Sequence, residues 1–192
     1  QARDCRALSH NGARYTICEV DARQSDLRLF LRDQTGPMGS FSRVDQQLAE
    51  QGLRLSFAMN AGMFHQDRSP VGLYVEEGRE QMRLIPSPGP GNFGLLPNGV
   101  FCIRQGRADV IESLRYQRQR PDCRYASQSG PMLVIDGQLH PRFLKDSSSK
   151  YIRNGVGTSG DGRRVVFAIS EDPVRFYDFA TLFRDQLQLP QA

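Results

Sequence analysis

The fold assignment depends on the segment Ser127-Gln128-Ser129-Gly130-Pro131-Met132-Leu133-Val134-Ile135-Asp136-Gly137-Gln138-Leu139-His140-Pro141. Its first five residues are small and polar, as in a turn, and they lead into residues 132–135, an apolar run typical of a strand. Asp136-Gly137 predicts a further turn. The next strand-like run opens at Arg153-Asn154-Gly155-Val156-Gly157. Because polar groups beside strands often form binding sites, this segment is the first candidate for a functional site.

The remaining sequence alternates strand patterns with two helical ones. Residues 42–52 have the cap, spacing and terminal glycine of a short amphipathic helix, and Asp178 begins a second helix with one apolar face. Strand-like runs occur at 15–20, 27–31, 53–59, 71–76, 82–85, 100–103, 110–111 and 165–170. We therefore predict an α+β fold, in which a largely antiparallel or mixed twisted sheet carries a few short helices.

Length and charge narrow the functional classes. The 192 residues suit one domain, and no apolar run reaches the roughly 18 residues of a membrane helix, so we expect no membrane span. The net charge is +4, and the only lysines are Lys145 and Lys150. Arginine suits carboxylate and phosphate ligands, although genome composition explains high arginine usage equally well. The basic and aromatic run Arg115-Tyr116-Gln117-Arg118-Gln119-Arg120 is short and isolated, so we interpret it as a solvated loop and expect no nucleic-acid partner.

The four cysteines allow three pairings. Cys5 and Cys18 flank His10-Asn11-Gly12, a hairpin pattern with arms of equal length, so these two cysteines are expected to lie opposite each other. Cys102 and Cys123 would then pair or remain free. An even number of cysteines with one sensible pair favours an oxidising compartment.

Four loops share one composition. Asn60-Ala61-Gly62, Asn98-Gly99, residues 127–131 and Arg153-Asn154-Gly155 each place Asn, Ser or Arg beside glycine and next to a strand. This arrangement brings backbone and side-chain amides close to a polar ligand. In any single loop, ordinary turn chemistry explains the same residues. Their repetition at strand ends is the stronger indication of a site.

Several familiar motifs fail. Ser129 lacks the flanking glycines of a nucleophile elbow, and the glycine spacing at 89–94 is followed by Pro97 where a dinucleotide-binding helix would begin. The histidines are scattered, and the cysteines lack zinc spacing. No pair of carboxylates with glycosidase spacing can be chosen. We therefore expect neither a metal nor a cofactor.

At these loops the sequence resembles the phosphodiester glycosidase family, which includes the enzyme that uncovers mannose 6-phosphate by removing N-acetylglucosamine from a phosphodiester. It looks closest to the short bacterial members, many of them exported. The matching stretches agree in order and spacing over nearly the whole chain: Ala58-Met59-Asn60-Ala61-Gly62-Met63-Phe64, Pro70-Val71-Gly72-Leu73, Asn98-Gly99-Val100-Phe101, Gln128-Ser129-Gly130-Pro131-Met132-Leu133-Val134, Arg153-Asn154-Gly155-Val156-Gly157 and Phe167-Ala168-Ile169-Ser170.

Two departures from the family pattern stand out. The family often has glycine where this chain has Ser129. Family members also continue past the last helix into a strand that ends in Leu-Asp-Gly followed by serine, whereas this sequence ends at Leu189-Pro190-Gln191-Ala192. We therefore expect residues 1–192 to form a single phosphodiester-glycosidase-like domain that lacks the family's C-terminal strand and its acidic residue.

The resemblance implies a periplasmic or secreted hydrolase that cleaves a sugar from a glycosidic phosphodiester or a related cell-envelope glycan. It implies catalytic roles for Arg153 and Asn60, with Arg153 binding the anionic group. The substrate-binding residues expected from the motifs are Gly62, Asn98, Ser129, Gly130 and Asn154. The alternative is a non-catalytic binding or scaffold domain with a polar cleft for a sugar or phosphate, which the absence of a clear carboxylate favours.

Overall fold

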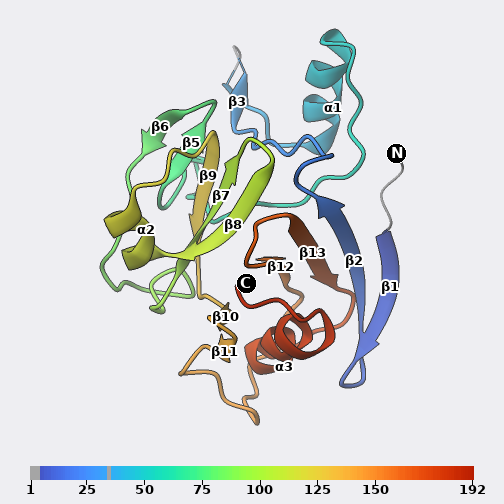
Figure 1. The fold of residues 1–192 in the computed structure, drawn as a ribbon, viewed down its shortest axis with the longest axis vertical. Coiled ribbons are helices and arrows are strands. Elements are labelled where there is room, and N and C mark those ends of the chain that lie inside the picture. The colour runs from blue at the N-terminus through green and yellow to red at the C-terminus, as the bar shows by residue number, and fades with distance from the viewer. Residues whose placement is uncertain (1–4, 34–35) are drawn as a thin grey trace.

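A computed structural model describes residues 5–33 and 36–192. Its strands form two main antiparallel sheets (Figure 1). The four-stranded sheet has the order β1-β2-β13-β12, and it joins the first hairpin of the chain to the last strands. Its members are β1 (Cys5–His10), β2 (Ala13–Asp21), β12 (Asn154–Thr158) and β13 (Arg164–Ser170).

The second sheet is five-stranded, in the order β6-β5-β9-β7-β8. Its strands are β5 (Tyr74–Glu76), β6 (Arg79–Met82), β7 (Gly99–Arg104), β8 (Arg107–Glu112) and β9 (Tyr125–Ser129). Two ribbons complete the strands: β3 (Arg32–Asp33) with β4 (Gly36–Pro37), and β10 (Val134–Ile135) with β11 (Gln138–Leu139). The α+β prediction is confirmed.

The helices are short. Helix α1 (Phe41–Glu50) is capped by Ser40, whose hydroxyl accepts a hydrogen bond from the Arg43 amide, and buries Val44 and Leu48. Helix α2 (Ser113–Gln119) follows β8, and α3 (Phe176–Thr181) continues into the π-helical turn η1 (Leu182–Gln186). The two predicted helices are thus present, and α2 is a third that the sequence patterns did not indicate.

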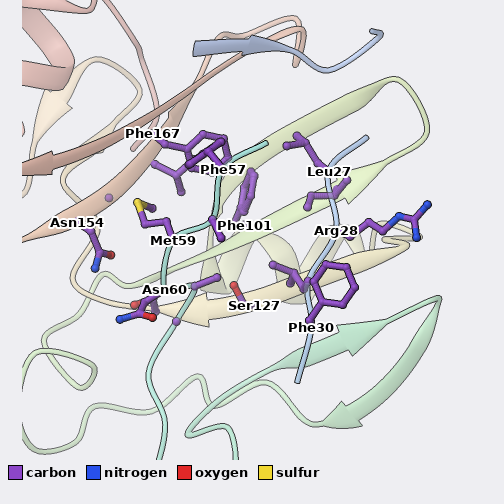
Figure 2. Close-up of a pocket in the computed structure, with 18 of the residues that line it drawn as sticks. Leu27, Arg28, Phe30, Phe57, Met59, Asn60, Phe101, Ser127, Asn154 and Phe167 are labelled. Carbon is purple, nitrogen blue, oxygen red and sulfur yellow. The ribbon is translucent and has the colours of Figure 1, made fainter. Parts of the chain in front are cut away.

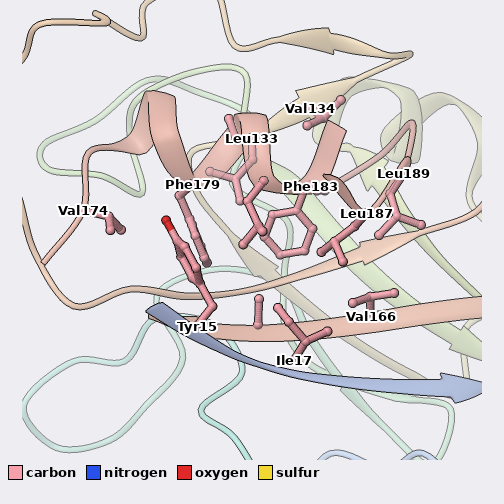
Figure 3. Close-up of a cluster of buried hydrophobic side chains, with 14 residues drawn as sticks. Tyr15, Ile17, Leu133, Val134, Val166, Val174, Phe179, Phe183, Leu187 and Leu189 are labelled. Atoms are coloured by element: carbon pink, nitrogen blue, oxygen red, sulfur yellow. The ribbon is translucent and has the colours of Figure 1, made fainter. Parts of the chain in front are cut away.

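Buried hydrophobic side chains of the described residues form four clusters: one packs α1 against Met38, and the other three are layers on the sheets. The first layer packs α3 and η1 against the four-stranded sheet and includes Tyr15, Phe179 and Phe183 (Figure 3). The second takes side chains from both sheets, among them Val165 and Phe101. The third lies on the five-stranded sheet, with Tyr116 of α2 packed at its margin. The middle layer holds the two sheets face to face.

Some sequence predictions were wrong in detail. Residues 27–31 and 53–59 were expected to be strands, but both run without ladder partners between α1 and the sheets. Residues 127–129, expected in a turn, belong to β9, and only residues 134–135 of the expected strand 132–135 pair, as β10. The basic run from Arg115 lies largely in α2, where Arg115 pairs with Asp136, so it is not a loop.

Both disulfides are formed. Cys5 lies opposite Cys18 in the β1–β2 register and is bonded to it, as the hairpin pattern predicted. The other two cysteines, whose state the sequence left open, form the Cys102–Cys123 bond between β7 and the segment before β9. Within the described ranges, no helix is both long enough and apolar enough to cross a membrane.

Candidate active site

A cavity of about 950 Å³ opens between the two sheets. The unpaired segments around 25–31 and 53–62 form part of its wall, together with β7, β9, β12 and β13 (Figure 2). The volume lies in the range of small-molecule sites, which is about 300–1,000 Å³. Residues 53–59 thus lie beside the cavity and not beside another strand, which explains why they form no ladder.

One end of the cavity is polar. Asn60, Ser127 and Asn154 lie together at this end in Figure 2, although they come from three distant parts of the chain. Asn60 begins the long loop that leads to β5, Ser127 belongs to β9, and Asn154 begins β12. Ser129 also lines the cavity. These amide and hydroxyl groups, hereafter the amide end, can both donate and accept hydrogen bonds, as sugar hydroxyls and phosphate oxygens require.

Two glycines allow the backbone segments to approach each other here. Gly62 has φ of +92°, and a Cβ at this position would lie 3.3 Å from the carbonyl oxygen of Gln128. A Cβ on Gly130 would lie 2.8 Å from Cβ of Asn98 and 2.9 Å from the Phe93 carbonyl oxygen. Both glycines line the cavity, and both are required for close packing against neighbouring chain segments.

The middle of the cavity is apolar. Phe167 of β13 makes edge contacts with Phe57 and Phe101, at centroid distances of 5.0 and 6.0 Å. Met59 lies between this aromatic group and the amide end (Figure 2). Toward the other end, Leu27 and further aliphatic side chains continue the lining. A purely polar ligand would find no partners in this part of the cavity.

The charged residues on the lining are mostly cationic: Asp26, Arg28, Arg54 and Arg68. Arg28 donates two hydrogen bonds to Asp26, at 3.0 and 2.8 Å, and this contact lowers the pKa of the Asp26 carboxyl. Among the described residues, Asp26 has the only carboxylate side chain on the lining, and Arg54 and Arg68 form no ion pair. The cavity therefore has an excess of positive charge, which suits an anionic ligand.

Asn98 lies outside this cavity. Its side chain is fully buried, its amide nitrogen donates to the Phe93 carbonyl at 2.8 Å, and its oxygen accepts from the Ser113 hydroxyl at 2.6 Å. It borders a separate, smaller cavity of about 260 Å³. In this structure the hydrogen bonds of Asn98 hold the Pro-rich loop before β7 against α2. The substrate-binding role expected from its motif stays a prediction.

Gln128, which the sequence patterns did not single out, is the centre of the same buried network. Its side-chain oxygen accepts from the amides of Leu73 and Ile85, at 3.1 and 3.0 Å. Its nitrogen donates to the Ile85 carbonyl at 2.8 Å and lies 3.3 Å from the Asn98 oxygen and 3.2 Å from the Ser113 hydroxyl. Gln128 thus joins its own strand to four other chain segments directly behind the amide end.

Arg153 is 9% exposed and also lies off the cavity lining. Its Nε donates to the Val174 carbonyl at 2.8 Å, and its guanidinium carbon lies 3.5 Å from the ring centre of Phe176. Phe176 does line the cavity. Burial lowers the pKa of Arg153, and no carboxylate within the described ranges pairs with it. Arg153 therefore does not line the cavity itself, but it contacts Phe176, which does.

The structure brings five of the seven predicted site residues to one cavity: Asn60, Gly62, Ser129, Gly130 and Asn154. Sequence reasoning missed the apolar middle and Arg68. Phe57, Phe101 and Phe167 stand within or beside the matched stretches, where the sequence indicates strand residues only. Arg68 follows the Asn60 loop, where the sequence indicates a turn. No group of three or more His, Cys, Asp or Glu that could hold a metal occurs in residues 5–33 and 36–192.

Comparison with known proteins gives three results. A family model described as phosphodiester glycosidase (NAGPA) matches residues 54–192. The chain is 30% identical over 191 residues to the uncharacterized protein YigE of Escherichia coli (strain K12), and the alignment covers 99% of this chain and 74% of YigE. It also resembles the zebrafish N-acetylglucosamine-1-phosphodiester alpha-N-acetylglucosaminidase catalytic domain, auto-inhibited by its pro-peptide. That similarity has a TM-score of 0.52 at 11% identity and covers 98% of this chain and 67% of the zebrafish chain, so it shows the fold alone. Because the family match covers well over half of its residues, the chain belongs to the phosphodiester glycosidase family.

Proposed function

We propose that this protein is a hydrolase that cleaves a sugar from a glycosidic phosphodiester, or a related cell-envelope glycan, at the amide end of the cavity. One observation carries the proposal. Residues from three separate family motifs, represented by Asn60, Ser129 and Asn154, line a single cavity with an excess of positive charge. Family membership supplies the reaction class, and the zebrafish enzyme with the same fold is named for a sugar 1-phosphodiester.

The reaction is the addition of water across the bond between the anomeric carbon and the phosphate oxygen. The bond from carbon to the phosphate oxygen breaks through an oxocarbenium-like state, water supplies the new hydroxyl, and the products are the free sugar and a phosphomonoester. A phosphomonoester is already a good leaving group, so strong acid assistance is less necessary. The protein must chiefly orient the sugar and stabilise the phosphate oxygens.

The amide end supplies groups for these tasks. Asn60 and Asn154 are exposed, so their amides are available to sugar hydroxyls and phosphate oxygens, and the Ser129 hydroxyl and Gly130 backbone complete this wall. We assign Arg153 a positioning role, because its guanidinium holds Phe176 against the cavity. The two disulfides support a periplasmic or secreted location, since such bonds persist in oxidising compartments.

A second candidate function is a binding domain that holds a sugar phosphate without hydrolysing it. The charges on the lining favour it, because Asp26 is the sole carboxylate side chain there among the described residues and is already ion-paired with Arg28. A carboxylate held in this way is a poor base for activating water.

Two measurements on the same sample separate these functions. The first follows an N-acetylglucosamine 1-(methyl phosphate) diester by phosphorus NMR, and the second measures binding of N-acetylglucosamine 1-phosphate by calorimetry. Release of free sugar and methyl phosphate in equal amounts is expected for the hydrolase. Binding without release would favour the binding domain, and neither binding nor release would overturn both assignments.

A further inference from the structure

The apolar middle of the cavity is larger than a sugar 1-phosphate needs. Between the amide end and Arg28, the lining consists of the aromatic side chains around Phe167 and the aliphatic side chains of residues 27–31 and 53–59 (Figure 2). A sugar hydroxyl placed there would lose its hydrogen bonds to water without finding new ones. A hydrocarbon chain placed there would leave water at no such cost.

The side-chain charges on the same lining are mostly positive and therefore favour an anionic ligand. Among the side chains on the lining, Arg28, Arg54 and Arg68 are cationic and Asp26 is anionic, which leaves an excess of two positive side-chain charges. Arg68 follows Asn60 in the loop between residues 60 and 70, and no ion pair involves it among the described residues. A neutral lipid or a neutral glycan would leave these cations without a counter-charge.

We infer that the ligand of this cavity is an anionic amphiphile, namely a sugar joined through a phosphodiester to a long hydrocarbon alcohol. The sugar would lie at the amide end, the phosphate would meet Arg68, which follows the Asn60 loop, and the hydrocarbon would fill the apolar middle toward Arg28. This inference rests on the proposed function for the place of the sugar. Hydrolysis at the anomeric carbon, with water as the second reactant, would then release the free sugar and a long-chain alkyl phosphate.

The inference is tested on the whole chain with alkyl phosphates that carry no sugar and no bond to hydrolyse. Butyl phosphate and octyl phosphate, each below its micelle concentration, are titrated by calorimetry. Burial of each methylene should tighten binding about three- to fourfold, so the octyl compound should bind on the order of a hundredfold more tightly. Equal affinities for the two compounds would overturn the inference.

A matched pair of substitutions locates the chain. Leu55 lines the cavity, whereas Leu84 is similarly half-buried in another part of the structure. Leu55→Trp should weaken octyl phosphate binding at least tenfold and leave butyl phosphate binding unchanged, and Leu84→Trp should change neither. An unchanged octyl affinity in folded Leu55→Trp would contradict the placement.

A second pair tests the anion. Arg68→Ala should weaken octyl phosphate at least fivefold without affecting octyl glucoside, and the exposed Arg79→Ala, off the cavity lining, is its control. Tighter binding of octanoate or octyl glucoside than of octyl phosphate would overturn the choice of a phosphate. The chain-length effect is independent of turnover, so sugar release without it would retain the proposed function alone, and the effect without release would retain this inference alone.

Discussion

Two Asn-Gly pairs in this protein look alike in sequence and behave differently in the structure. Asn98-Gly99 leads into β7, and Asn154-Gly155 opens β12. The Asn98 side chain is 0% exposed and bonded to Phe93 and Ser113, whereas Asn154 is exposed on the cavity lining. The pair predicts a tight backbone in both places. What surrounds the side chain decides whether it holds the fold together or remains available to a ligand.

The largest effect is expected at the centre of the buried network. Gln128→Leu leaves the amides of Leu73 and Ile85 without their acceptor, so the free energy of unfolding should fall by about 3–5 kcal/mol. Urea denaturation measures it, with the exposed Gln138→Leu as the control expected to change stability by less than about 0.5 kcal/mol. A loss under about 1 kcal/mol for Gln128→Leu would show that the network is not what joins these segments.

Next come the two asparagines themselves. Asn98→Ala should cost about 2–3 kcal/mol of stability because the Phe93 carbonyl and the Ser113 hydroxyl lose their partner. Asn154→Ala should change stability by no more than about 0.5 kcal/mol, since its side chain is exposed. Thermal and urea unfolding of both variants check the contrast. Similar losses at the two sites would remove the distinction drawn between them.

Arg153 lies between these extremes. Arg153→Ala removes the bond to Val174 and the contact with Phe176, yet it also removes a buried charge without a carboxylate partner among the described residues, so a net loss of about 1–2 kcal/mol is expected. The KM for a sugar phosphodiester should rise because Phe176 loses its support, and kcat should fall less. Arg142→Ala, an exposed change in the preceding loop, should alter neither quantity. An unchanged KM would remove the positioning role.

The smallest effect concerns an exposed ion pair. Hydrogen bonds from Arg115 and then Gln191 lower the pKa of Asp136 to about 2. Because the folded pKa lies below the unfolded value of about 3.9, the added stability is complete above about pH 4 and is lost as the pH falls toward 2. Exposure limits it to less than about 1 kcal/mol.

The measurement is urea denaturation of the wild type and Asp136→Asn at pH 6 and near pH 2. Asparagine tolerates the positive φ of this position, so the variant changes the charge and little else. The difference in stability between the two proteins should shrink at the lower pH. A difference that stays constant or grows as the pH falls would contradict the assignment to this carboxyl.

Much of the fold could be predicted from the sequence because local patterns specify it. The Asn11-Gly12 turn, the opposed cysteines Cys5 and Cys18 and the helix expected over 42–52 all depend on neighbours within a few residues. The helix cap is Ser40, two residues before the expected start. Residues 27–31 and 53–59 have the same alternation as true strands. A strand also needs a neighbouring strand to hydrogen-bond with, and these two segments border the cavity instead. Periodicity describes the residues of a segment and not what lies beside it.

The site divides in the same way. The motifs correctly placed Asn60, Ser129 and Asn154 together, because the three loops that carry them meet at the cavity. They also selected Asn98, whose different role follows from contacts with Phe93 and Ser113 that depend on the tertiary fold. Gln128 stands in a matched stretch, but its place at the centre of the buried network has no local signal, since its partners lie between 15 and 55 residues away in sequence.

The most direct test of the central claim compares Asn154→Ala with Asn92→Ala, an exposed asparagine outside both cavities, in the hydrolysis of N-acetylglucosamine 1-(methyl phosphate). The measured quantity is kcat/KM for release of free sugar. We predict that Asn92→Ala matches the wild type and that Asn154→Ala, equally stable, is about ten- to a hundredfold slower. Equal rates in the two variants would contradict the assignment of the amide end as the site of catalysis.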